Sequence, residues 1–116
     1  MIIMKIAVKE VQGICLISIS GRIDSRCSVD LERALYKAIS ENSRIIIDLA
    51  DTEYISSSGL RVLLAEKKRL GEIDGEMILM QLQPAVRDVF EVAGLARLFL
   101  IKKSWEEALL SIKSRP

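Results

Sequence analysis

The chain of 116 residues contains no histidine, so it lacks the side chain that enzymes use most often as a general base. A Ser-His-Asp triad is excluded, and so are the many zinc sites that are built on imidazole. Two separated cysteines, Cys15 and Cys27, do not make a metal site either. The sequence also has no Gly-x-Ser-x-Gly elbow and no glycine-rich phosphate loop. We therefore expect a protein that is not an enzyme and that holds no metal or cofactor.

The chain also lacks an excess of charge of either sign, because 17 basic and 16 acidic residues leave a net charge of +1. This balance gives no electrostatic reason to bind nucleic acid or an anionic membrane. The apolar residues 1–4 are interrupted by Lys5 and fall far short of the roughly 20 residues that a membrane span needs. The composition favours a protein partner or a small ligand, with no nucleic-acid and no membrane partner.

No signal peptide is apparent, so we expect a cytoplasmic protein with reduced thiols rather than a disulfide between Cys15 and Cys27. Half of the residues are apolar, and the length is near the usual size of one domain. We expect a single domain over residues 1–116. Nothing in the sequence demands more than a monomer.

Hydrophobic periodicity predicts the secondary structure. Two β-branched runs, 3–9 and 14–20, are joined at Gln12-Gly13 as in an edge hairpin, and Gly21 is expected to end the second run. Further strands are predicted at 45–49, 76–82 and 98–101, the first of them central and covered on both faces. Amphipathic helices with start and stop signals are predicted from Ser25 or Ser28 to Glu41, and at 58–71, 84–94 and 104–112.

The predicted element order is ββαβαβαβα, with about four helices. Strands that alternate with helices after an initial hairpin imply a mixed β-sheet, whose later strands run parallel and are joined by right-handed crossovers. The predicted fold class is α/β.

Three consecutive serines, Ser56, Ser57 and Ser58, lie where the central strand is followed by an amphipathic helix. The first N–H groups of a helix lack intrahelical partners, so a serine oxygen or a phosphate is favourably placed there. A phosphate on Ser57 would add roughly −1.5 to −2 charge units. The simpler interpretation is a serine-rich helix cap.

Three segments together resemble the STAS domain family, and within it the bacterial anti-sigma factor antagonists. They are Gly-Arg-Ile-Asp at 21–24, the run from Asp48 to Leu60, and the run from Pro84 to Leu95. They occur in the family's order and spacing, so the likeness covers nearly the whole chain.

The resemblance implies a switch protein that, when unphosphorylated, binds an anti-sigma factor serine kinase and so releases a sigma factor. Phosphorylation of one serine inactivates the switch, and a serine phosphatase restores it. The family pattern is Asp-Ser-Ser/Thr-Gly, and Ser57 here matches the acceptor. Ser58 matches the second hydroxyl, while Ser56 stands in place of the aspartate.

The resemblance also implies where partners bind. Asp24 matches an aspartate near the family's kinase-facing surface, although such a residue is also typical of a turn or helix cap. We expect the partner surface to combine Asp24 with the loop at 51–56 and the first helical turn, and so to include Ser56, Ser58 and Gly59.

The sequence is compatible with several alternatives. Ser56 could itself accept the phosphate, or the chain could be a STAS scaffold or nucleotide-binding module without a phosphorylation cycle. Asp48, with Lys102 or Lys103, could mimic the receiver domain of a response regulator, although a hairpin stands where a receiver has a helix. The basic run 67–69 is most simply a solvated helix face.

Overall fold

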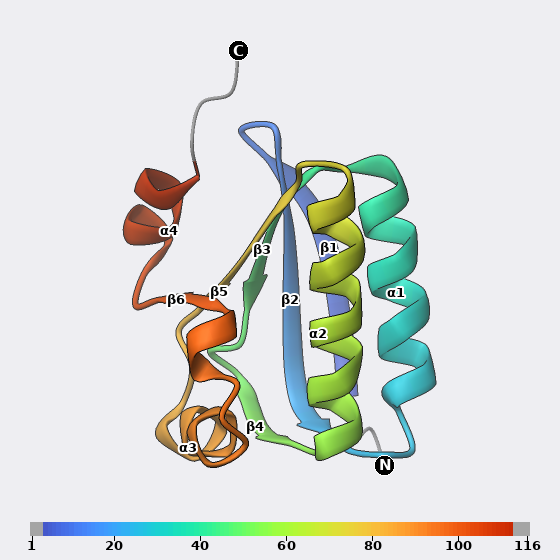
Figure 1. Cartoon of the computed structure of the whole chain (residues 1–116), viewed down its shortest axis with the longest axis vertical. Coiled ribbons are helices and arrows are strands. Elements are labelled where there is room, and N and C mark those ends of the chain that lie inside the picture. Colours follow the sequence, from blue (N-terminus) through green and yellow to red (C-terminus); the bar gives the residue numbers. More distant parts are fainter. Residues whose placement is uncertain (1–3, 113–116) are drawn as a thin grey trace.

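The computed structural model describes residues 4–112 and shows one mixed β-sheet with helices on both faces (Figure 1). Residue 3, where the first strand was expected to begin, lies outside the described residues. In chain order the elements are β1 (Met4–Val11), β2 (Ile14–Ile23), α1 (Ser28–Glu41), β3 (Arg44–Asp48), β4 (Thr52–Ile55), α2 (Ser57–Glu72), β5 (Glu76–Met80), α3 (Pro84–Val92), a 3₁₀ turn (Ala96–Leu98), β6 (Leu100–Lys102) and α4 (Trp105–Ser111).

The sheet has the strand order β1-β2-β3-β5-β6, and β4 pairs separately with the end of β2. β1 runs antiparallel to β2, whereas all the other paired strands are parallel. The predicted α/β class with an N-terminal hairpin and a central third strand is therefore confirmed. No helix within residues 4–112 is long and apolar enough to cross a lipid bilayer.

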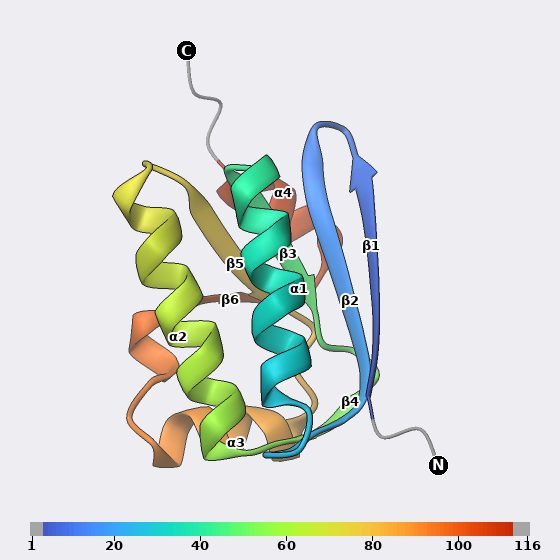
Figure 2. The same cartoon turned by 90° about the vertical axis from the view of Figure 1, so that its right-hand side faces the viewer.

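Alternation along the central strands creates two apolar layers, because successive side chains of a strand point to opposite faces of the sheet. In β3, Ile45 and Ile47 belong to the layer under α1 and α2, whereas Ile46 belongs to the layer under α4. Figure 2 shows α1 and α2 side by side in front of the sheet, with α4 behind it. The continuous apolar run of β3 is explained by this covering on both sides.

The hairpin turn follows the predicted chemistry. Gln12 and Gly13 have φ of 55° and 79°, so both lie in the left-handed region. Two-residue turns with positive φ at both positions match the right-handed twist of antiparallel strands.

The structure has one strand that the sequence does not predict, and its second strand is longer than predicted. From the sequence, the second strand is predicted to end at Gly21 and residues 51–56 are predicted to form a loop. In the structure, β2 continues to Ile23 because Gly21 adopts a φ of 93°, and the segment Thr52–Ile55 pairs in parallel with this extension. In this four-residue strand the two end residues, Thr52 and Ile55, are buried and the two between them are exposed, so the sequence lacks the alternation that indicates a strand and only the tertiary pairing reveals it.

The last strand also differs from its prediction. Residues 96–98 form a 3₁₀ turn, and β6 runs from Leu100 to Lys102 rather than over 98–101. At the start of α4, Ser104 Oγ accepts from the N–H of Glu107 at 3.1 Å, as a capping box requires. The Glu107 carboxylate accepts a hydrogen bond from the N–H of Lys103 rather than from that of Ser104.

We predict that Phe90→Ala lowers the free energy of unfolding by about 3–5 kcal/mol, because it leaves a large cavity in the core. Phe90 is fully buried, and its ring meets that of Phe99 edge to face at a centroid distance of 5.4 Å. Urea unfolding followed by circular dichroism measures the change. The control is Leu110→Ala, which should change stability by less than about 0.5 kcal/mol since Leu110 is 87% exposed. Similar losses in both variants would contradict the assignment of the core.

Candidate functional site

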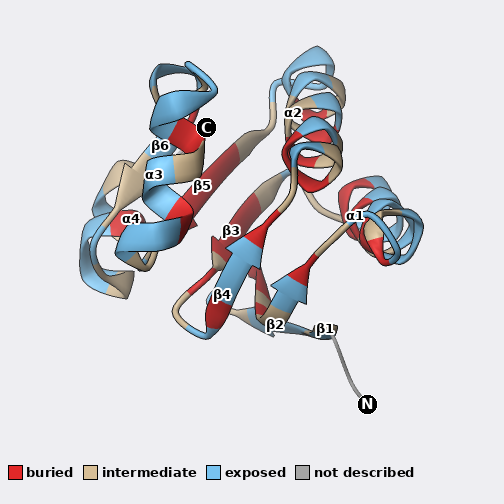
Figure 3. Cartoon of the chain, turned by 90° about the horizontal axis from the view of Figure 1, so that it is seen from below, coloured by how far each residue is buried: buried red, intermediate tan, exposed pale blue. Residues whose placement is uncertain are grey.

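The parallel pairing of β2 with β4 brings two distant chain segments together at one end of the molecule. Ile23 lies opposite Ile55, and the N–H of Ser56 donates to the carbonyl of Ile23 at 2.7 Å. The residues that follow the two strands, Asp24 and Ser56, are therefore neighbours. Figure 3 looks onto this end, where β2 and β4 lead into α1 and α2. The structure thus joins the two parts of the predicted partner surface.

Ser56 caps α2. Its backbone is extended, and its Oγ accepts from the N–H of Gly59 at 3.2 Å and lies 2.9 Å from the Oγ of Ser58. Serine is as good an N-cap as aspartate, so the chain keeps the cap at the position where the family has an acidic residue. The hydroxyls of Ser56 and Ser58 are both engaged in hydrogen bonds, and both residues are half-buried.

Ser57 is the first residue of α2, one position earlier than the predicted helix start, and it is exposed. Within the described part of the chain its hydroxyl makes no hydrogen bond. Of the three serine hydroxyls, it is the one that is both accessible and free. The unpaired N–H groups of the first helical turn lie beside it and favour a negative group there.

Gly59 is buried beneath the exposed first turn of α2 and is not part of the surface. A Cβ at this position would come within 2.7 Å of Ile23 Cγ2 and 3.0 Å of Ile55 Cγ1. The absence of a side chain therefore lets α2 pack directly on the ends of β2 and β4. Any effect of Gly59 on a partner would be indirect, through the position of α2.

Asp24 is held in the turn before α1. Its carboxylate accepts from the N–H of Arg26 at 2.9 Å and forms a salt bridge of 2.9 Å with the Arg26 guanidinium. Hydrogen bonding to Arg26 lowers the pKa of Asp24, so the carboxylate is ionised at neutral pH. Its side chain is only 18% exposed, while that of Arg26 is 73% exposed. The exposed charge at this point therefore belongs mainly to the arginine.

Cys27 packs against the same turn, where its Sγ lies 3.2 Å from the N–H of Asp24 and 3.3 Å from its carbonyl oxygen. Burial raises the pKa of the Cys27 thiol. A neutral, buried thiol is a packing group, and we assign it no chemistry.

An apolar hollow of about 310 Å³ lies between the first turns of α2 and helix α3. Val92 is 89% exposed beside it. The hollow is not among the features predicted from the sequence, although the position of Val92 outside the buried stripe of α3 is a signal for an exposed apolar contact. The residues that line the hollow are Ser57, Leu60, Asp88, Val89, Val92 and Ala93.

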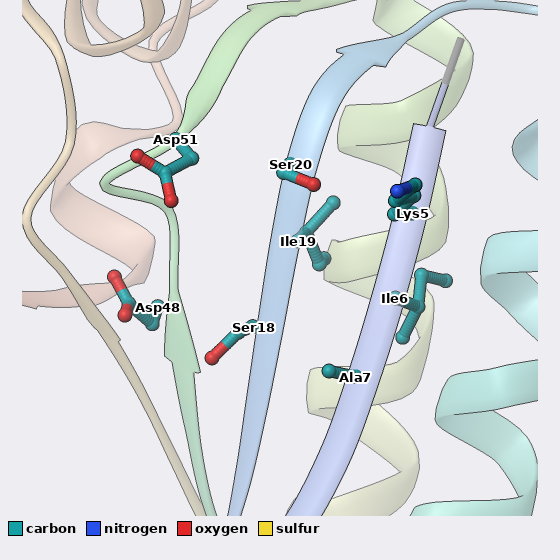
Figure 4. A pocket seen from close by; sticks show the side chains of 8 residues that line it. All are labelled: Lys5, Ile6, Ala7, Ser18, Ile19, Ser20, Asp48 and Asp51. Atoms are coloured by element: carbon teal, nitrogen blue, oxygen red, sulfur yellow. The ribbon is translucent and has the colours of Figure 1, made fainter. Parts of the chain in front are cut away.

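A second hollow, of about 360 Å³, lies on the face of the sheet that is turned away from α1 and α2. The small side chains of Ala7 and Ser18 leave space there (Figure 4). Asp48 and Asp51 also line it, and the Asp48 carboxylate accepts from the N–H of Ala50 at 2.9 Å. Within residues 4–112 no group of three or more acidic, cysteine or histidine side chains is placed to hold a metal ion.

The order of strands and helices differs from that of a response-regulator receiver domain, the alternative considered for Asp48. A receiver needs a helix directly after its first strand, but β1 enters the hairpin, and β4 rather than a helix follows β3. The role of Asp48 that the structure shows is to satisfy a local backbone group at the end of its strand.

Residues 5–108 match the model of the STAS domain. The chain belongs to the STAS domain family. BtrV of Bordetella bronchiseptica, which is named as a proposed anti-sigma factor antagonist, is 34% identical over 112 residues that cover 96% of this chain and 97% of BtrV. The resemblance inferred from the three sequence segments is therefore confirmed.

Solved structures of the family share the fold. An anti-sigma factor antagonist from Mycobacterium paratuberculosis superposes with a TM-score of 0.85 at 27% identity, covering 96% of this chain and 95% of that one. SpoIIAA, an anti-sigma factor antagonist, superposes in its unphosphorylated form with a TM-score of 0.78 at 23% identity, covering 95% of this chain and 100% of its own. The phosphorylated form of SpoIIAA from Bacillus superposes with a TM-score of 0.72 at 21% identity, covering 94% and 100%.

We predict that Gly59→Ala lowers the free energy of unfolding by about 1–3 kcal/mol, because the new methyl group overpacks the contact with Ile23 and Ile55. Gly71→Ala in the same helix is the matched control. A Cβ at Gly71 meets no atom within 4 Å, so this change should raise stability by up to about 1 kcal/mol through helix propensity. Both values follow from urea titration. A stabilising Gly59→Ala would show that α2 does not rest closely on the two strand ends.

Proposed function

We propose that this STAS domain is an anti-sigma factor antagonist that binds an anti-sigma factor serine kinase and is switched off by phosphorylation of Ser57. The observation that carries the proposal is the state of Ser57, whose exposed hydroxyl is free while both neighbouring serine hydroxyls are engaged. The names of the relatives support the antagonist role, and the phosphorylated SpoIIAA structure supports a phosphorylation cycle.

The hydrogen bonds select the acceptor among the three serines. A kinase must take the proton of the hydroxyl it modifies and must place that oxygen in line with the transferred phosphate. Phosphorylation of Ser56 would break the cap on the N–H of Gly59 and would require the end of α2 to open. Ser57 requires no such change, so we assign it the acceptor role and Ser56 the cap.

The apolar hollow beside Ser57 explains how one phosphate would block docking. An apolar side chain of the anti-sigma factor that enters the hollow removes water from its rim, and Ser57 is part of that rim. A phosphate there carries roughly −1.5 to −2 charges and strongly resists the loss of its water. Asp88, which lines the same hollow, adds repulsion. Release of the partner therefore needs no change of fold, and removal of the phosphate by a serine phosphatase restores the surface.

Ser57→Ala should bind the anti-sigma kinase like the wild type but accept no phosphate, because the docking surface is kept and the acceptor is lost. Ser57→Asp should bind more weakly, since a carboxylate places charge at the rim. Binding is measured by titration calorimetry, and the phosphate is located by mass spectrometry after incubation with kinase and ATP.

Ser56→Ala is the control for the acceptor assignment. It should still be phosphorylated at Ser57, with a loss of roughly 1 kcal/mol of stability from the missing cap. Phosphate found on Ser56 alone in the wild type would assign the acceptor role to Ser56 instead of Ser57. Phosphate on neither serine would contradict the proposed switch.

Val92→Asp should weaken binding of the same kinase by about tenfold or more, because a charge at the hollow opposes apolar docking and 1.4 kcal/mol corresponds to a factor of ten. Leu110→Asp is the matched control. Leu110 is 87% exposed and Val92 is 89% exposed, but Leu110 lies on α4, behind the sheet. Affinities from calorimetry that fall equally in both variants, or in neither, would place the interface elsewhere.

A further inference from the structure

Arg61 lies four residues after Ser57 on α2, and both residues are exposed. Side chains at i and i+4 are neighbours on a helix surface, with about 5–6 Å between their Cβ atoms. Helical side chains also lean toward the N-terminus of the helix, so the long Arg61 side chain is directed back over the turn that holds Ser57. The guanidinium and the serine hydroxyl therefore share one patch of surface.

The guanidinium of Arg61 is available, whereas two other arginines at this end are engaged. Arg22 stacks on the Tyr54 ring at 4.4 Å from its centroid, and Arg26 pairs with Asp24. Over residues 4–112, Arg61 has neither an ion pair nor a side-chain hydrogen bond. It is thus a positive group without a carboxylate partner, one helical turn from the accepting serine.

We propose that Arg61 forms an ion pair with the phosphate of phosphorylated Ser57. This inference deepens the proposed function and rests on it for the presence of the phosphate. A guanidinium presents a planar fork of donors that fits two phosphate oxygens, and a helical i, i+4 pair holds it at the right distance.

The charges around the site give this pair a specific task. Asp88 of α3 lines the same hollow as Ser57, and Asp24 follows the neighbouring strand β2. The Asp24 carboxylate is already paired with Arg26, so the uncompensated carboxylate that disfavours a dianion at Ser57 is that of Asp88. Arg61 offsets the Asp88 charge and stabilises the dianionic phosphate. Phosphorylation would then also occupy a guanidinium that is free on the unmodified surface.

The test uses the full chain with phosphoserine incorporated at position 57 during synthesis, so that no kinase is needed. A ³¹P NMR titration gives the second pKa of the phosphate. Arg61→Gln should raise this pKa by about 0.3 units, the size expected for an exposed i, i+4 ion pair. Arg61→Lys should restore part of the shift, because lysine keeps the charge without the planar fork.

Lys68→Gln removes the same charge from the same helix and is the control. Lys68 is exposed and lies eleven residues beyond Ser57, about 16 Å along the helix axis, farther than the screening length at physiological salt. This variant should leave the phosphate pKa unchanged. Equal pKa values in Arg61→Gln and Lys68→Gln would overturn the ion pair. Because the phosphate is installed chemically, failure of a kinase to label Ser57 would contradict the proposed function without changing this measurement.

Discussion

The short parallel pairing between the end of β2 and β4 is the interaction on which the candidate site depends. It places Ile23 opposite Ile55 and carries the hydrogen bond from the N–H of Ser56 to the carbonyl of Ile23. Without this pairing, the turn that contains Asp24 and the start of α2 would not be held in a fixed position relative to each other. Gly59 completes the arrangement, because only a residue without a side chain lets α2 lie so close to both strands. Backbone geometry thus positions the surface on which the proposed switch acts.

Environment, rather than residue type, distinguishes the three serines of this site. The three side chains are chemically identical. The hydroxyls of Ser56 and Ser58 are hydrogen-bonded to each other, and that of Ser57 takes no part in this bond. The helix cap requires an acceptor at the position before the helix, and Ser56 provides it. Satisfying that requirement leaves the next hydroxyl exposed. The cap interpretation and the switch interpretation of the serine run therefore describe two different residues.

The proposed switch acts at the rim of an apolar contact and leaves the core undisturbed. The hollow between α2 and α3 offers a partner a small apolar surface, and Ser57 lies on its edge. Moving a phosphate dianion out of water is far less favourable than burying a hydroxyl, so a single modification can reverse binding while the core stays intact. The sheet and its covering helices form the buried core of this STAS domain, and the proposed switch acts at the end of the sheet, outside that core.

The sequence by itself determined the α/β class, the hairpin at Gln12-Gly13, the central strand and the four helices, because these depend on periodicity and on local turn and cap chemistry. It also located the serine run at a helix start. Only the tertiary structure decided that residues 52–55 form a strand, since their pairing partner lies some thirty residues earlier in the chain. The same holds for the buried position of Gly59 and for the apolar hollow beside Ser57, because both arise from packing between elements that are distant in sequence.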